Sequence, residues 1–345
     1  MKKNNLLLAL SCIVYINQIN AQGIVVDNIK KKVLVEHFST ALCSTCPAAH
    51  DKWKNVLKQK DDVIQVTHHS GYQTDIYTIS ESVDYIWFYN SAGTVAPAAM
   101  IDRTNLSSQG AMTFGGGPVF GISTEADLSK FINYGLNIAA GISIFIESEY
   151  DETTKDLNIR ISGTTLNTEN DVYLNVFITE DKLVSQQAGA TSTIREYEHN
   201  HVLRKVLTNV WGDAVQFSDN KYLAEYNYQI TENWKVGNLQ LIAFLSNYNS
   251  SNVNNCKVIN AESVAVGESS PTVGINNTQQ FPASVYVKDK TVFIDGEYSI
   301  ANIYNLTGKK VKQLNANNSS VELSRGIYIV EIIAGNRRSV RKVSL

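Results

Sequence analysis

The sequence VLVEHFSTALCSTCPAAHDKWKNVL, residues 33–57, decides the fold of the first part of the chain. Its apolar start, Val33–Phe38, predicts a β-strand, and a Cys-x-x-Cys motif at Cys43–Cys46 follows that strand. Apolar side chains at helical spacing then predict a helix as far as Leu57, and Val63–Val66 predicts a second strand. This order of strand, motif, helix and strand is typical of the start of an α/β layer fold.

The two cysteines have a chemistry that follows from their position. At the amino end of a helix, unpaired N–H groups and the helix dipole stabilise a thiolate, so Cys43 is the candidate nucleophile. Cys46 is the candidate resolving thiol, which attacks the mixed disulfide. A purely structural disulfide is one alternative, and half of a zinc site is another. The sequence has no second Cys pair, so zinc would need His50, or His68 and His69, brought close by folding.

A proline some fifty residues downstream supports the redox interpretation. Pro97 stands just before a predicted strand, Ala98–Asp102. Thioredoxin-like folds place a cis-proline there, packed against the disulfide and exposing backbone to a substrate strand. The motif and the proline together predict a thioredoxin-like domain in which Pro97 is a backbone clamp. His37, six residues before Cys43, stands where such enzymes often have a buried acid. It is a candidate proton shuttle, with a core histidine as the alternative.

The first residues predict export. Lys2 and Lys3 precede the apolar run Leu6–Ile16, and a polar stretch ends at Ala21, which predicts a signal peptide at residues 1–21. Lipidation at Cys12 is the alternative. Cleavage leaves 28 basic residues against 33 acidic ones, a net charge of −5, which excludes a large nucleic-acid-binding surface. No later apolar run is long enough for a membrane helix, so no membrane span is expected in the mature chain.

The pattern of the sequence changes near residue 140. Apolar and polar residues alternate from Ile142 to about Val266, which predicts an antiparallel, sandwich-like β-domain. Residues 267–282 have the composition of a linker, and the strand-dense residues 283–345 predict a small all-β domain. The predicted fold class is therefore α+β multi-domain, with a thioredoxin-like α/β domain at 22–140, a β-rich domain at 141–266, and the linker and C-terminal domain after it.

Three cysteines remain after cleavage of the signal peptide. In an oxidising compartment Cys43 pairs naturally with Cys46, so Cys256 is predicted to be a buried free thiol. Pairing of Cys256 with another molecule is the alternative. His199 and His201 share a face if their segment is a strand, and a structural role is expected for both. The sequence predicts no cofactor and no metal site.

Residues 30–265 resemble the outer-membrane-protein-twenty-eight-related family of Bacteroidetes. The matching stretches are Val33–Phe38, Cys43–Pro47, His68, Ala96-Pro97 and His199–Arg204. The resemblance implies a thioredoxin-like domain coupled to a β-rich domain, with a poorly defined biochemical activity. This sequence departs from the usual pattern at Leu42, Ser44 and His37, where an aromatic residue, Gly and an acid are commoner. These differences bear on redox efficiency and not on the fold.

Residues 283–345 are similar to the C-terminal sorting domain of type IX secretion. The similarity lies in Ile303–Gly308, in Leu323–Tyr328 and in the closing Lys342-Val343. It implies passage through the periplasm and then across the outer membrane, with the type IX machinery as the partner. The expected location is therefore the medium or the outer-membrane surface.

Two functional hypotheses follow. The leading one is a secreted or cell-surface thiol–disulfide oxidoreductase, acting on protein thiols or disulfides through Cys43 and Cys46. The alternative is a non-catalytic binding or adhesion protein in which the disulfide only stiffens the first domain. An exposed Cys43 favours the first hypothesis, and a buried Cys43 favours the second.

Overall fold

The computed structural model describes residues 29–345, apart from 59, 72, 91–92, 167–170, 231–232, 271–282, 289, 306, 316–317 and 335–336. The predicted signal peptide, Cys12 and most of the predicted linker lie outside the described residues. The chain divides into two compact units, Met1–Thr272 and Val273–Leu345. In the part of the chain that is described, no helix combines the length and the apolar character needed to cross a membrane.

The first unit starts with the predicted elements. β1 (Val33–Ser39), α1 (Cys46–Leu57) and β2 (Val63–His69) confirm the predicted order of strand, motif, helix and strand. However, α1 begins at Cys46 and not at Cys43, because Pro47 has a fixed φ and no N–H, and is therefore suited to the first turn of a helix. The remaining described elements of this unit are α2 (Ser80–Tyr89), β3 (Ala98–Ile101), η1 (Ser107–Gln109), β4 (Phe120–Gly121), α3 (Glu125–Leu136), β5 (Phe145–Tyr150), β6 (Asp156–Thr164), β7 (Val172–Glu180), β8 (Leu183–Ala188), β9 (Thr193–His199), β10 (Val202–Val206), β11 (Asp213–Ala214), β12 (Lys221–Gln229), η2 (Val236–Asn238), β13 (Leu239–Asn247), η3 (Val253–Asn255) and β14 (Val258–Ala265).

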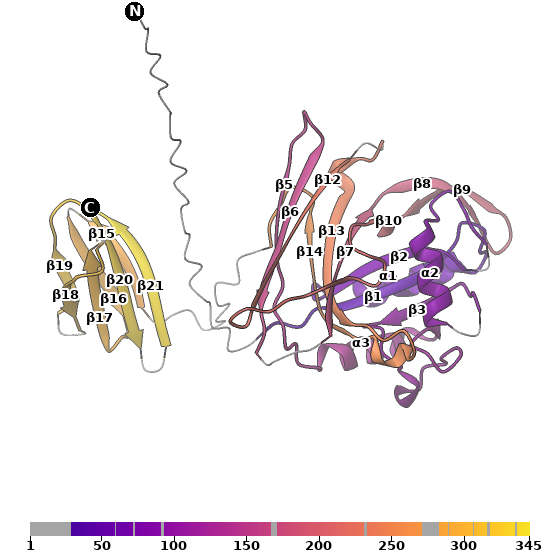
Figure 1. Ribbon diagram of the computed structural model, residues 1–345, viewed down its shortest axis with the longest axis horizontal. Coiled ribbons are helices and arrows are strands. Elements are labelled where there is room, and N and C mark those ends of the chain that lie inside the picture. Colours follow the sequence, from indigo (N-terminus) through magenta and orange to yellow (C-terminus); the bar gives the residue numbers. More distant parts are fainter. Residues whose placement is uncertain are drawn as a thin grey trace, which may run out of the picture. The chain divides into compact units, whose positions relative to one another are not determined.

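One large sheet organises this unit (Figure 1). Over the described residues it has nine strands in the order β14-β13-β7-β10-β2-β1-β3-β4, with β11 added beside β7. β1 and β2 are parallel, as expected for strands joined by a helix, whereas β3 runs antiparallel to β1. β10 joins β2 through the pairing of Val202 with Thr67. Strands from both sides of the boundary predicted at residue 140 therefore share the same sheet, and the separate domains 22–140 and 141–266 stay a prediction.

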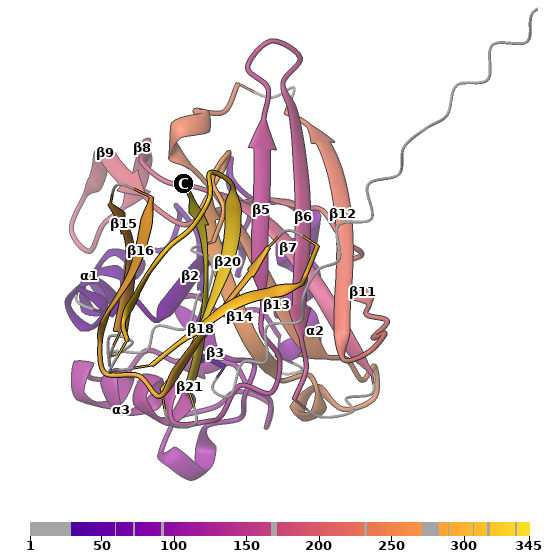
Figure 2. The same cartoon turned by 90° about the vertical axis from the view of Figure 1, so that its left-hand side faces the viewer.

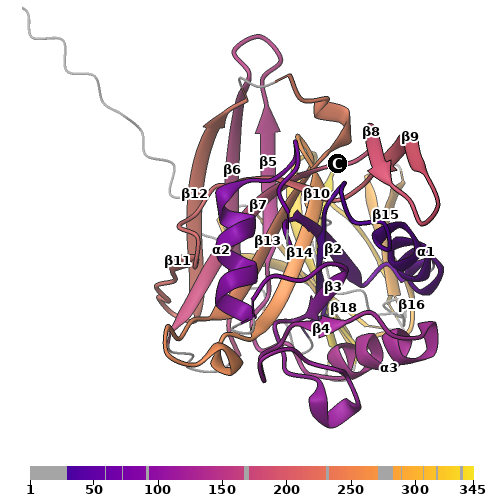
Figure 3. The same cartoon turned by 90° about the vertical axis from the view of Figure 1, so that its right-hand side faces the viewer.

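The two faces of this sheet are covered by different layers. α1 and α3 lie on one face of β1 and β3, where Trp53 and Phe131 pack against Val33 and Val35. α2 lies on the other face, where Tyr85 and its neighbours pack against β1, β7 and β13 (Figure 3). Successive residues of a strand point to opposite faces, so Leu34, Glu36 and Phe38 lie toward α2 while His37 lies toward α1. Burial of each large apolar side chain in these layers contributes roughly 1.5–3 kcal/mol.

A second sheet covers the part of the large sheet that α1 and α3 leave open. It has the order β12-β6-β5, and Ile146 and Ile159 from it pack against Val176 of β7 and Leu241 of β13. The alternation of apolar and polar residues that predicted a sandwich-like region is explained by this pair of sheets. One layer of the sandwich is thus formed by strands that continue the sheet of the Cys-x-x-Cys region.

Strands β8 and β9 form a hairpin that stands apart from both sheets. They pair with each other in an antiparallel, two-stranded sheet, and no other strand in the described ranges pairs with them. In Figures 2 and 3 the hairpin extends from the sheet on the side where α1 lies. It therefore connects the region after β7 to the neighbourhood of the cysteines.

The second unit is all β, as predicted for residues 283–345. Its described strands form two sheets with the orders β15-β16-β19 and β18-β17-β20-β21. Val292, Ile303 and Val330 are among the buried side chains of its own core, so it is built as an independent β module. The strands are β15 (Ala283–Lys288), β16 (Thr291–Gly296), β17 (Ile300–Asn305), β18 (Lys310–Leu314), β19 (Ser320–Glu322), β20 (Ile327–Ala334) and β21 (Arg337–Ser344).

Candidate functional site

The Cys43–Cys46 pair lies where β1 leads into α1. The two residues form a disulfide, with Cα atoms 5.4 Å apart, which confirms the predicted pairing. The N–H of Cys43 donates to the carbonyl oxygen of Thr40 at 3.0 Å, so the chain turns sharply just before the motif. Both cysteines are buried, with exposed fractions of 1% for Cys43 and 0% for Cys46. A buried Cys43 is what the binding hypothesis predicts, and it differs from the exposed nucleophile of the redox hypothesis.

Pro97 lies at the start of the strand next to β1. The Ala96–Pro97 peptide bond is cis, as predicted. The residue after it, Ala98, pairs with Phe38 at the end of β1, from which the cysteine loop departs. Pro97 and the cysteine loop therefore lie at the same end of the sheet.

The β8–β9 hairpin contacts the cysteine loop, a contact that no sequence pattern predicted. The N–H of Ala188 donates to the carbonyl oxygen of Ala41 at 2.7 Å. The side chain of Gln187 is fully buried, and its Nε2 donates to the carbonyl oxygens of Cys43 at 2.8 Å and Thr40 at 3.3 Å. A glutamine in an alternating strand is usually a solvent-facing residue, so no pattern marked Gln187 in advance.

His37 lies on the face of β1 that α1 covers. Its ring packs edge-on against Trp53, with ring centroids 4.8 Å apart. Burial lowers the pKa of His37 well below its ordinary value, nearby His50 and His201 lower it further, and the Gln65 side chain opposes the shift. The imidazole is therefore neutral at pH 7 and a weak base.

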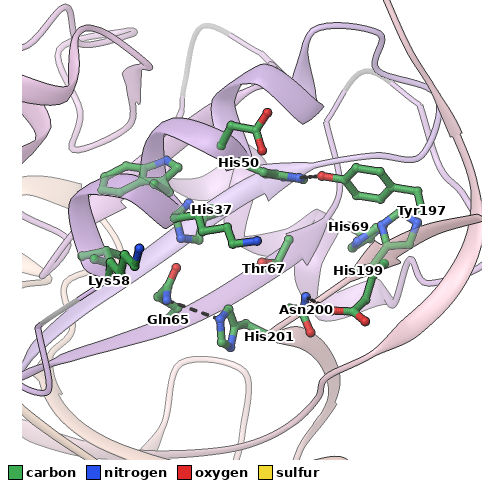
Figure 4. A pocket seen from close by; sticks show the side chains of 15 residues that line it. His37, His50, Lys58, Gln65, Thr67, His69, Tyr197, His199, Asn200 and His201 are labelled. Carbon is green, nitrogen blue, oxygen red and sulfur yellow. Dashed lines mark hydrogen bonds between the residues drawn. The ribbon is translucent and has the colours of Figure 1, made fainter. Parts of the chain in front are cut away.

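A cavity of about 530 Å³ opens beside His37 (Figure 4). Five of the six histidines in the chain line it, and they come from β1, α1, β2, and the end of β9 with the turn that follows. Neither cysteine is among the residues that line the cavity. The complete lining is His37, His50, Asp51, Trp53, Lys54, Leu57, Lys58, Gln65, Thr67, His69, Tyr197, Glu198, His199, Asn200 and His201.

Three of these histidines are each fixed through one ring nitrogen. His69 Nδ1 lies 2.7 Å from the Asp75 carboxylate, His50 Nδ1 lies 2.8 Å from the Tyr197 hydroxyl, and His199 Nε2 lies 3.0 Å from the Ser185 hydroxyl. The rings of His69 and His199 are 5.1 Å apart, and Figure 4 shows them side by side. β9 ends at His199, so His201 follows the strand and does not share a strand face with it. Among the described residues, no group of three or more His, Cys, Asp or Glu side chains is placed to hold a metal ion.

The burial and crowding of these rings predict that the first unit is sensitive to acid. Burial lowers the pKa of His50 to about 4, and His69 and His201 add to the shift. Burial also lowers the pKa of His199 to about 4, with His69 and His50 adding to it and Asp75 opposing it. Both folded-state pKa values lie below the ordinary value of 6.5. Between about pH 4 and pH 6.5 the unfolded chain therefore binds protons that the folded chain does not. The stability from the neutral rings is complete above pH 6.5 and is lost as the pH falls toward 4.

We therefore expect the urea midpoint of the first unit to fall between about pH 7 and pH 5. Glu36 and Asp75 contribute little in that window, because their pKa values of about 2 affect stability only at lower pH. The double variant His50→Gln, His199→Gln should show a smaller fall over the same range. Equal falls in the two proteins would show that other groups cause the acid sensitivity.

A buried charge network lies on the opposite face of β1, beneath α2. The guanidinium of Arg103 donates to both carboxylate oxygens of Glu36, from Nε at 2.8 Å and from Nη2 at 2.9 Å. His68 Nε2 lies 3.2 Å from the same carboxylate. Arg103 lowers the pKa of Glu36 to about 2 against the effect of burial, so Glu36 is ionised in the core. This network fixes the sheet beneath α2 and is separate from the cavity.

Cys256 belongs neither to the histidine-lined cavity nor to the hydrogen-bonded network of Glu36 and Arg103. It is a buried free cysteine, which confirms the prediction, and it accepts a hydrogen bond from the N–H of Asn249 at 3.2 Å. Burial raises the pKa of its thiol, so the thiolate is disfavoured.

Two family models match parts of the chain. One, described as outer membrane protein Omp28, matches residues 84–270. The other, described as a secretion system C-terminal sorting domain, matches residues 282–345. A search of the curated proteins found no match.

Two solved structures from Porphyromonas gingivalis are similar to this chain. HBP35 matches over 92% of this chain and 99% of its own, with a TM-score of 0.59 and 19% sequence identity. At that identity the match shows a similar fold alone. A crystal structure of a domain of the outer membrane lipoprotein Omp28 matches over 38% of this chain and 92% of its own, with a TM-score of 0.24 and 20% identity.

Proposed function

The chain belongs to the outer membrane protein Omp28 family, and we propose that its first unit exchanges disulfides with partner proteins. The sorting domain at its C-terminus directs it to the medium or the outer-membrane surface. The observation that carries the proposal is the Cys43–Cys46 disulfide between β1 and α1, with Pro97 at the start of the adjacent β3. This arrangement is the one expected of a thioredoxin-like domain, and the fold similarity to HBP35 is consistent with it.

The proposed reaction uses the two thiols of the reduced pair. The Cys43 thiolate attacks one sulfur of a partner disulfide, the partner S–S bond breaks, and one partner thiolate leaves. The Cys46 thiolate then attacks the Cys43 sulfur of the mixed disulfide, which closes the Cys43–Cys46 bond and releases the second partner thiolate. Two electrons pass to the partner, and a thiol reductant must restore the pair. Pro97 would hold the partner backbone, and His37 would carry a proton during the second step.

His37 is suited to only a small part in this scheme. Its lowered pKa makes it a weak base at neutral pH, and its ring lines the cavity beneath α1. Its loss should therefore slow resolution of the mixed disulfide and leave the first attack unchanged.

A second candidate function is favoured by the burial of both cysteines. A disulfide with exposed fractions of 1% and 0% is well placed to stiffen the loop between β1 and α1. In that case the protein is a non-catalytic surface protein that binds a ligand elsewhere.

Reduction of a model disulfide by the pre-reduced protein separates the two candidates. The redox proposal predicts a rate well above that of a simple dithiol at the same pH, because the helix terminus stabilises the thiolate. A rate no faster than the simple dithiol would leave the structural disulfide as the better account.

The sorting domain gives a separate prediction about location. Deletion of residues 283–345 should leave the protein in the periplasm, because that unit has its own core and carries the match to the sorting domain. Immunoblots of periplasm, medium and cell surface provide the measurement. Arrival of the truncated protein at the surface or in the medium would show that the export signal lies elsewhere.

A further inference from the structure

We propose that the β8–β9 hairpin is a gate over the Cys43–Cys46 disulfide, closed by Gln187 and opened by an extended segment of the partner protein. The proposal rests on the proposed function, because exchange requires a partner sulfur to reach Cys43. In the closed structure Cys43 is 1% exposed, so a covering element must move before an in-line attack on its sulfur is sterically allowed.

The contacts of Gln187 identify the covering element. Its Nε2 donates to the carbonyl oxygens of Cys43 and Thr40, on both sides of the turn that precedes the motif. One residue later, Ala188 donates its backbone N–H to Ala41. The end of β8 therefore lies along the cysteine loop and satisfies three of its carbonyl groups.

The base of the hairpin has a second attachment, at the histidine cavity. Tyr197 reaches back to His50 on α1 through its hydroxyl, as Figure 4 shows. The ring of His199 packs against His69 on β2 and against Tyr77, at centroid distances of 5.1 and 5.2 Å. These aromatic contacts form a hinge that stays attached while the tip moves.

The hairpin itself has little to hold it in place. A two-stranded hairpin without a third strand is marginally stable in water, and β8 and β9 pair only with each other in the described part of the chain. Val184, near the start of β8, is 61% exposed, and most of β9 is exposed as well. Elements with few buried contacts open at low free-energy cost. Lifting the tip breaks the hydrogen bonds of Gln187 and Ala188 and leaves the three hydrophobic cores of the first unit intact.

The carbonyl groups that the gate covers also define the class of partner. When β8 lifts, the carbonyl oxygen of Ala41 loses the N–H of Ala188, while those of Thr40 and Cys43 lose Gln187 and keep the N–H groups of Cys43 and Cys46. An unpaired carbonyl group in a buried loop is costly. An extended protein segment can donate a backbone N–H to the Ala41 carbonyl, whereas a small thiol such as dithiothreitol has no N–H group to offer. The gate therefore favours cysteines that lie in extended segments of a protein.

Gln187 is thus a positioning residue, and its substitution tests the gate. The oxidised mature protein would be treated with dithiothreitol, and the newly formed thiols alkylated and counted by mass over time. Gln187→Ala and the isosteric Gln187→Glu should be reduced roughly tenfold faster than wild type, because both lose the hydrogen bonds that Nε2 donates to the cysteine loop. The matched control is Gln186→Ala, since Gln186 is the exposed neighbour of the same type, and it should react at the wild-type rate.

The outcomes distinguish the gate from the proposed function. Both Gln187 variants reacting at the wild-type rate, with unchanged urea midpoints, would overturn the gate. Turnover of a model disulfide by wild type and the variants is measured in parallel and tests the proposed function. If dithiothreitol reduces the Gln187 variants faster but none of the proteins turns over the model disulfide, the gate is supported and the redox role is contradicted. Gln187→Ala should increase the rate of reduction by a cysteine-containing extended peptide less than the rate of reduction by dithiothreitol, because the peptide opens the gate itself. An equal increase in the two rates would overturn the assignment of the partner class.

Discussion

Arg103→Met is expected to lower the free energy of unfolding of the first unit by about 3–5 kcal/mol. Arg103 is 1% exposed and holds the fully buried Glu36 through two hydrogen bonds, with a third to the Tyr89 hydroxyl at 3.0 Å. Its guanidinium also lies over the ring of Phe244 at 4.8 Å. Removal of the cation leaves an ionised carboxylate in an apolar core with only His68 beside it, and such a charge is strongly destabilising.

Urea unfolding of the first unit measures this effect, and two further variants identify its cause. Glu36→Gln added to Arg103→Met should recover part of the lost stability, because it removes the uncompensated charge. Arg160→Met is the matched control: its side chain is 54% exposed and lies 3.8 Å from Glu147, so a change within about 0.5 kcal/mol is expected. If Arg103→Met cost no more than Arg160→Met, the buried pair would not be a stabilising feature of the core.

Local structure near the motif was predictable because it depends on short-range pattern. The apolar run that starts at Val33 forms β1, and the helical spacing that places Trp53 inward forms α1. The pairing of Cys43 with Cys46 and the burial of Cys256 followed from cysteine count and compartment. All four features depend on residues close in sequence or on a count of cysteines. None of them requires knowledge of the tertiary fold.

The large sheet was not predictable in the same way. β7 is buried on both faces, with Val176 toward β6 and Phe177 toward α2, so its alternation of apolar and polar residues is weak. Its link to the first strands passes through β10, and the single pairing of Val202 with Thr67 has no local signature. The change in pattern near residue 140 therefore predicts a domain boundary. The large sheet nevertheless contains strands from both sides of that position.

The site itself depends mostly on contacts between distant residues. Glu36 and Arg103 are 67 positions apart, and Gln187 and Cys43 are 144 apart. Each histidine of the cavity has an ordinary interpretation when taken singly, and only folding brings five of them to one place. The sequence predicted Cys43 and Cys46 as the candidates for sulfur chemistry, and the structure adds the contacts that Gln187 makes with their loop.

Cys43→Ser should abolish reduction of a model disulfide by the pre-reduced protein, because the attacking thiolate is gone. Cys46→Ser should retain the first attack and accumulate a mixed disulfide, since no second thiol remains in the motif to resolve it. Cys256 does not replace it, because its thiol is buried and its pKa is raised. Non-reducing gels and mass spectrometry of Cys46→Ser should show a partner bound through Cys43. Serine variants that both retain wild-type turnover would exclude the pair as the catalytic group. Loss of turnover in both, without any trapped partner, would show that Cys43 is not the attacking thiol.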